Sequence, residues 1–151
     1  MNYELLTKQL LSFAETDPGM IPLLANASAL LFDALEQVNW AGFYLAREGN
    51  LVLGPFQGKP ACVHIPRGRG VCGTAWANNE TLRIPDVHQF PGHIACDCAS
   101  RSEIVIPLRK DGIVLGVLDI DSPVLGRFTP ADQAGLEAFA RAIENVVRWN
   151  E

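Results

Sequence analysis

Hydrophobic residues recur three or four positions apart near the start of the chain. Residues 3–14 carry Leu6, Leu10 and Phe13 at this spacing, and the sequence DPG at positions 17–19 interrupts the pattern. This period predicts two amphipathic helices joined by a turn. The second helix is expected over residues 20–36, with its apolar face at Leu24, Ala27, Leu31 and Leu35.

A third long helix is predicted at the end of the chain, in the sequence FTPADQAGLEAFARAIENVVRWN. Thr129 is the expected N-cap, because its side chain can accept a hydrogen bond from the first turn. Pro130 suits the first helical position, where a backbone N–H is not required. The predicted apolar face consists of Leu136, Phe139, Ile143 and Val147.

Between these helices the pattern changes to alternation, which is typical of strands. The segment NWAGFYLAREGNLVLGPFQG predicts two strands with REGN as their hairpin loop, and ACVHIP predicts a short third strand. The segments SEIVIPLRKDG and IVLGVLDIDSP predict two more, joined at KDG. Before them, the glycines at positions 68, 70 and 73 open a short helix over residues 71–77, and a long loop is expected over about 85–102.

Hairpin connections dominate this order, so we expect an antiparallel sheet and an α+β fold. The terminal helices should pack on one face of the sheet. The small helix and the long loop should cover the other face. We treat residues 1–151 as a single domain, since a chain of this length can bury a sizeable core.

Composition and charge narrow the possible functions. The formal charge is −5, and the twelve Lys and Arg residues are scattered, which argues against nucleic acid or an anionic membrane as partner. No apolar stretch approaches the roughly 18 residues of a transmembrane helix. The acidic N-terminal sequence does not have the pattern of a signal peptide, so we expect a cytoplasmic protein.

Three carboxylates stand out because they occupy apolar strands. Asp119 and Asp121 share one face of a predicted strand, and Glu103 opens the neighbouring strand. Such acids can cap a turn or pair with arginine at a strand end. Together they favour a functional acidic cluster, because an unpaired buried charge is costly.

Two aromatic residues share one face of the first predicted strand. Trp40 and Tyr44 point the same way as Gly42. Ala41, Phe43 and Leu45 point the other way. They could belong to the core. Alternatively, they could form a cage for a small apolar or cationic group, with Gly42 leaving space between them.

Four cysteines lie in the middle of the chain, at positions 62, 72, 96 and 98. Cys72 is predicted at the start of the short helix, where the helix dipole would lower its pKa and make the thiol reactive. An inert, buried cysteine fits the same position. Cys96 lies in the predicted loop PGHIACDCASRSE, so a disulfide with Cys62 would require that loop to move.

A zinc site is one further interpretation of the cysteines. They could supply tetrahedral ligands together with His88 and His93. However, the sequence has no C-x-x-C pair. A surface or hydrogen-bonded role fits each histidine better, His64 included, and we expect no metal site.

Five stretches together resemble one family, the free methionine-(R)-sulfoxide reductases, which are stand-alone GAF domains. The resemblance is carried by VNWAGFYL, QGKPACVHIPRGRGVCGTAW, IPDVHQFPGHIACDCASRSEIVIPL, GVLDIDSP and FTPAD. It implies a GAF fold and the reduction of free L-methionine-(R)-sulfoxide without metal, flavin or other cofactor. It also implies thioredoxin as the reductant and a homodimer formed through the terminal helices.

The resemblance also implies residue roles for the thiols. Cys96 would attack the sulfoxide sulfur and become a sulfenic acid, and Cys62 would then form a disulfide with it. Cys72 would be an auxiliary thiol or an alternative to Cys62 in forming the disulfide. Cys98 departs from the family pattern and has no implied role; a disulfide between residues one apart would be strained.

Further roles follow for the pocket. Glu103 and Asp121 would polarise or protonate the sulfoxide oxygen, and Asp119 would orient them or bind the substrate ammonium. The remaining substrate contacts would come from the rings of Trp40 and Tyr44 around the S-methyl group, and from backbone N–H groups near Ile94, Ala95 and Cys96. The alternative is a GAF domain that senses a small molecule or redox state without catalysis.

Overall fold

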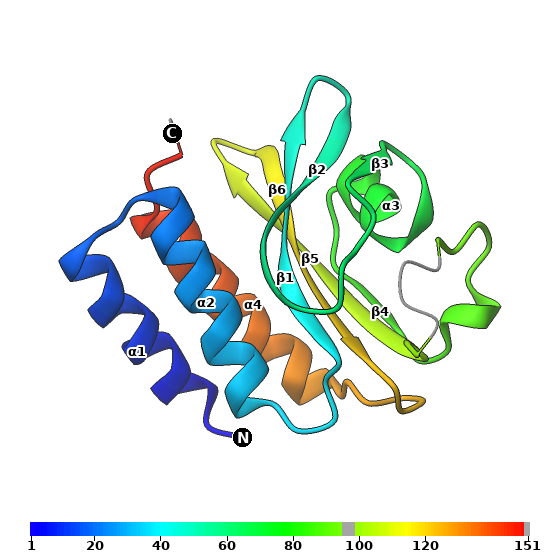
Figure 1. Cartoon of the computed structure of the whole chain (residues 1–151), viewed down its shortest axis with the longest axis horizontal. Coiled ribbons are helices and arrows are strands. Elements are labelled where there is room, and N and C mark those ends of the chain that lie inside the picture. Colours follow the sequence, from blue (N-terminus) through cyan, green and yellow to red (C-terminus); the bar gives the residue numbers. More distant parts are fainter. Residues whose placement is uncertain (95–98, 150–151) are drawn as a thin grey trace.

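The sheet has six antiparallel strands in the part of the chain that the computed structural model describes, residues 1–94 and 99–149. Its order is β3-β2-β1-β6-β5-β4, with α1, α2 and α4 on one side and α3 on the other (Figure 1). The predicted α+β class and the placement of the helices are therefore confirmed. The helices are α1 (Tyr3–Thr16), α2 (Met20–Ala34), α3 (Gly70–Asn78) and α4 (Pro130–Val146). The strands are β1 (Trp40–Arg47), β2 (Asn50–Gly58), β3 (His64–Pro66), β4 (Leu82–Ile84), β5 (Ser102–Lys110) and β6 (Ile113–Ser122).

The main core lies between the sheet and the three long helices. Phe43 of β1 and Leu118 of β6 face these helices and are fully buried. Leu6 and Leu10 of α1 join the same core, as their spacing predicts. Phe13 has the same spacing but is 41% exposed, so its expected place on the apolar face is wrong: Ala14, the next residue, packs against the core instead.

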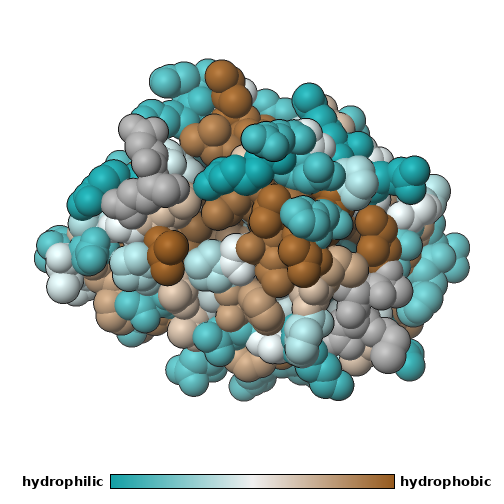
Figure 2. All heavy atoms as spheres, turned by 45° about the horizontal axis from the view of Figure 1, so that its top comes forward, coloured by the Kyte–Doolittle hydropathy of each residue, from teal (hydrophilic) through white to brown (hydrophobic). Residues whose placement is uncertain are grey.

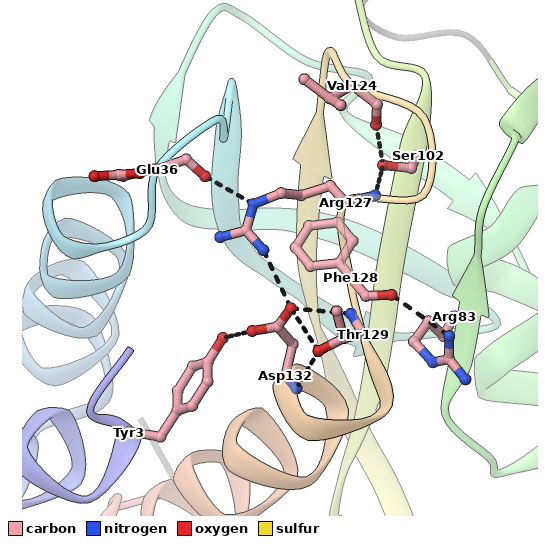
Figure 3. A network of polar contacts seen from close by, with 9 residues as sticks. All are labelled: Tyr3, Glu36, Arg83, Ser102, Val124, Arg127, Phe128, Thr129 and Asp132. Atoms are coloured by element: carbon pink, nitrogen blue, oxygen red, sulfur yellow. Dashed lines mark hydrogen bonds and ion pairs between the residues drawn. The ribbon is translucent and has the colours of Figure 1, made fainter.

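The N-terminus of α4 is held by a network of polar contacts that joins distant parts of the chain (Figure 3). Thr129 caps the helix as predicted, and it forms a capping box with Asp132. The Asp132 carboxylate also accepts a hydrogen bond from the Tyr3 hydroxyl at 2.6 Å and pairs with Arg127 at 3.1 Å. The helix ends at Val146, earlier than predicted, while Val147 beyond it is still buried against the core.

Both predicted hairpin loops are confirmed by the backbone. Asp111 and Gly112, between β5 and β6, have φ values of 54° and 78°. Glu48 and Gly49, between β1 and β2, have φ values of 48° and 84°. Positive φ at both central residues matches the twist of a two-residue hairpin.

The second face of the sheet packs against α3. Val105 and Val117 on the strands form a smaller core with Val71 and Ala75 of the helix. The connection after α3 is more regular than expected, because β4 pairs with β5 and a 3-10 turn follows at Val87–Gln89. The five-strand prediction was therefore one strand short.

The surface is mixed in character. On the face drawn in Figure 2, hydrophobic side chains gather near the middle and hydrophilic ones surround them. Among the described helices, none has the length and apolar character needed to cross a membrane.

Candidate active site

A cavity lies on the α3 side of the sheet, where β1, β5 and β6 run beside one another. Its wall combines aromatic rings, a thiol and carboxyl groups. The residues of these types that line it are Trp40, Tyr44, Cys72, Glu103, Asp119 and Asp121. The structure thus brings together six of the side chains singled out from the sequence.

Strand register explains why the three carboxyl groups meet. Glu103 of β5 lies directly opposite Asp121 of β6, and Asp119 is two residues before Asp121 on the same face. Ile120, between Asp119 and Asp121 in the sequence, is on the opposite face of the strand and packs against the long helices. Glu103 and Asp119 are only 6% and 5% exposed, so two acids of the predicted cluster are buried, while Asp121 is half-buried.

Burial changes the ionisation of these groups. The pKa of Glu103 is raised well above its usual range, first by burial and then by the negative charges of Asp119 and Asp121. Burial also raises the pKa of Asp119, although its hydrogen bond with Glu103 opposes that shift. Both shifts favour the protonated form of these carboxyl groups, and Glu103 is the one whose pKa the neighbouring acids raise further.

Cys72 lies in the first turn of α3, and its Sγ is 3.9 Å from Oε2 of Glu103. The dipole argument predicted a lowered pKa for this thiol, and that prediction is wrong. Burial raises the pKa of Cys72, and the charges of Asp119 and Glu103 raise it further. Loss of solvation and two nearby carboxylates outweigh a short helix dipole, so the thiol is buried and protonated.

The two aromatic side chains form a stack with a third ring that the sequence did not suggest. The ring centroids of Trp40 and Tyr44 are 5.8 Å apart, and Phe56 of β2 stacks on Trp40 at 5.1 Å. Gly42 does not leave space for a ligand, contrary to expectation. A Cβ added at Gly42 would lie 2.3 Å from Cβ of Phe56, so the neighbouring strand fills that space.

The same two rings hold the segment that leads to Cys62. The indole N–H of Trp40 donates to the carbonyl of Lys59 at 3.2 Å. The hydroxyl of Tyr44 donates to the carbonyl of Cys62 at 3.0 Å. Burial raises the pKa of this phenol, with a further rise from Asp119, so it remains a donor at neutral pH. Trp40 and Tyr44 are thus both core residues and part of the cavity wall.

Two basic side chains also line the cavity, and sequence reasoning gave neither a pocket role. Nε2 of His93 lies 4.0 Å from Oε1 of Glu103, and burial lowers the pKa of this imidazole. Arg69 is the N-cap of α3 and contributes its side chain from the cavity rim. Ile94, expected near the substrate, also lines the cavity and contacts Gly70.

The remaining candidates lie at the edge of the site or outside the described residues. Cys62 is disulfide-bonded and does not line the cavity, whereas Cys72 is free. Ala95, Cys96 and Cys98 lie outside the described residues. His88 is an exposed residue that lies beside Asp86, at 3.4 Å, rather than beside Cys62 or Cys72.

Comparison with known proteins identifies the class of domain that this fold and cavity define. The GAF domain family matches residues 3–147, and the chain belongs to that family. "Protein YtsP" of Bacillus subtilis is 60% identical over 97% of this chain and 91% of its own. The "Free methionine-R-sulfoxide reductase" of Escherichia coli is 58% identical over 87% of this chain and 79% of its own.

A solved structure extends the likeness to the whole fold. The Staphylococcus aureus protein described as fRMsr in complex with substrate superimposes with a TM-score of 0.92. It is 54% identical and covers 97% of this chain and 96% of its own. At this level of similarity, the sheet and the helices around the cavity correspond throughout the aligned chain.

Proposed function

We propose that the protein reduces free L-methionine-(R)-sulfoxide to L-methionine. The observation that carries the proposal is the group of Glu103, Asp119 and Asp121 in a cavity also lined by aromatic rings, in a chain so similar to named reductases of this substrate. A sulfoxide oxygen is a poor leaving group until it is protonated. A protonated carboxyl group in an apolar pocket supplies that proton.

The reaction proceeds through thiol chemistry. The thiolate of Cys96 attacks the sulfoxide sulfur and forms a sulfur–sulfur bond, while protonation of the oxygen breaks the sulfur–oxygen bond and releases water. Water then attacks the Cys96 sulfur, which breaks the sulfur–sulfur bond, frees methionine and releases a proton. The net products are methionine and a sulfenic acid on Cys96. The thiol of Cys62 then displaces water from the sulfenic acid and forms a disulfide. Thioredoxin reduces this disulfide and returns both thiols.

The cavity residues bind the substrate and supply protons. Glu103 and Asp121 face each other across the strand pair and act on the sulfoxide oxygen. Asp119 is the anionic partner for the substrate ammonium. The rings of Trp40 and Tyr44 enclose the S-methyl group and select the R epimer. Backbone N–H groups around Ile94 and Ala95 hold the carboxylate.

Other features complete the proposal. Cys72, buried beside Glu103, is an auxiliary thiol rather than the nucleophile. A cycle that uses thioredoxin belongs in a reducing compartment, such as the cytoplasm. The outer faces of α1 and α2, with exposed Leu5, Phe13 and Ile21, provide the surface for a homodimer.

A single-turnover experiment tests the proposed roles. Reduced protein is mixed with the R epimer and no reductant, and methionine and protein disulfide are measured by mass spectrometry. Cys96→Ser should release no methionine. Cys62→Ser should release one methionine per site and then stop. Full activity of Cys96→Ser would refute the assignment of the nucleophile.

A further inference from the structure

One thiol and two carboxyl groups converge on the wall of the cavity from three different elements. Cys72 comes from α3, Glu103 from β5 and Asp119 from β6. One donor atom of each residue lies within 4.8 Å of the donor atoms of the other two. Sulfur and two carboxylate oxygens are all ligands for a divalent transition metal.

These three side chains are buried, and one of their carboxyl oxygens lacks a hydrogen bond. Cys72, Glu103 and Asp119 are 4%, 6% and 5% exposed. Oδ1 of Asp119 is buried and has no hydrogen-bond partner among the described residues. Leaving a buried acceptor unsatisfied costs free energy. Because Asp119 lines the cavity, a ligand that enters the cavity can bind this oxygen.

We propose that Cys72, Glu103 and Asp119 form a binding site for Zn²⁺ that blocks the cavity. Zinc bonds of about 2.3 Å to sulfur and about 2.0–2.2 Å to oxygen place tetrahedral ligands roughly 3.5 Å apart. The Cys72 Sγ to Glu103 Oε2 distance of 3.9 Å therefore needs only a small side-chain adjustment. Three protein ligands leave the fourth position open to water.

The donor set determines which metal binds. A thiolate favours zinc and disfavours Mg²⁺ and Ca²⁺, which prefer oxygen ligands alone. Coordination breaks the S–H bond of Cys72 and the O–H bond of any protonated carboxyl ligand, forms Zn–S and Zn–O bonds, and releases these protons to solvent. The ion would occupy the same carboxyl groups that the proposed reaction uses, so bound zinc would act as an inhibitor. Binding itself does not depend on the proposed function; only the inhibition does.

A cysteine-reduced background isolates the proposed site. With Cys62→Ser, Cys96→Ser and Cys98→Ser combined, Cys72 is the one cysteine left in the chain. Co²⁺ is the spectroscopic probe, because a cobalt–thiolate bond gives a charge-transfer absorption. We expect one Co²⁺ per chain with this absorption, and displacement by one equivalent of Zn²⁺. Adding Cys72→Ser should abolish the absorption.

Two carboxylate variants in this background form a matched pair. Asp119→Asn should weaken zinc affinity, measured by calorimetry, by more than about tenfold, since removing even an indirect partner of a metal site costs about that much. Asp121→Asn removes the same charge from the same cavity and should have a much smaller effect. Circular dichroism checks that each variant is folded, and Glu103→Gln replaces Asp119→Asn if that variant unfolds.

Several results would overturn the proposal. They are no binding of Co²⁺ or Zn²⁺, Co²⁺ binding without the thiolate absorption, an equal loss of zinc affinity in the two aspartate variants, or Mg²⁺ binding as tight as that of Zn²⁺. In the wild-type protein, Zn²⁺ should lower sulfoxide turnover and EDTA should restore it. Unchanged turnover with zinc bound at the site would refute inhibition. If the metal-free wild-type protein does not reduce the sulfoxide at all, the proposed function is refuted, but the conclusion on zinc binding is unaffected.

Discussion

The hydrogen bond from Tyr44 to the backbone of Cys62 offers a test of how the cavity controls the second thiol. Tyr44→Phe keeps the buried ring and removes only the hydroxyl, whose oxygen lies 3.0 Å from the Cys62 carbonyl oxygen. Loss of one such bond costs about 1 kcal/mol of unfolding free energy. For a domain of this size, that corresponds to a fall in Tm of about 2–4 °C.

The same bond restrains the segment that carries Cys62. Cys62 is disulfide-bonded in the structure that shows this bond. A hydrogen bond that forms as the disulfide forms stabilises the transition state but not the reduced protein, so losing about 1 kcal/mol should slow disulfide formation by about fivefold. The rate of methionine release in the first step should change less, because the aromatic ring at position 44 remains on the cavity wall. Rapid quenching with a thiol-alkylating reagent, followed by mass spectrometry, measures both steps in one experiment.

Tyr3→Phe is the matched control for this prediction. It also removes a phenol hydroxyl that makes a hydrogen bond, here to Asp132, far from the cavity. It should lower stability without slowing disulfide formation. The reasoning fails if Tyr44→Phe is destabilised as expected and still forms the disulfide at the wild-type rate, or if both variants slow that step equally.

Three further predictions follow from other contacts. Glu103→Gln should lower kcat by about a hundredfold or more, because an amide cannot supply the proton; near-normal kcat would exclude Glu103 as the acid. Gly42→Ala should destabilise the protein in urea unfolding, since the new Cβ would lie 2.3 Å from Cβ of Phe56, and an unchanged unfolding midpoint would contradict this. Although burial opposes the shift, hydrogen bonds from Tyr3 and Thr129 and the charge of Arg127 lower the pKa of Asp132. Its stabilising contribution is therefore present above the unfolded pKa of about 3.9 and lost as pH falls through the folded value. The stability difference between wild type and Asp132→Asn should be constant from pH 5 to 8 and shrink below about pH 4; a difference that grows in acid would be inconsistent.

The periodic parts of the fold could be predicted from sequence, because period and capping are local properties. The helix start at Thr129 and the hairpin at Asp111 are examples, and both are as expected. Strand β4 was missed because three residues are too few to show alternation. Phe13 has the right spacing for burial, yet spacing alone cannot show that its neighbour Ala14 is the residue that packs against the core.

In the site, too, features set by nearby residues could be predicted, and features set by distant residues could not. Alternation alone placed Asp119 and Asp121 on one face, and the position of Glu103 at the start of the next strand made their meeting predictable. The pKa of Cys72 could not be inferred, because it depends on burial and on carboxylates from distant strands. The place of Phe56 beside Gly42 depends on a register shift between β1 and β2, which no local pattern reveals.

The most direct test of the central claim compares the two epimers of the substrate. NADPH oxidation is followed with thioredoxin and thioredoxin reductase, while free methionine-(R)-sulfoxide and the S epimer are offered separately to the fully reduced protein. Sustained turnover with the R epimer and none with the S epimer is the predicted result. Equal turnover of both epimers, or of neither by the folded protein, would contradict the proposed function.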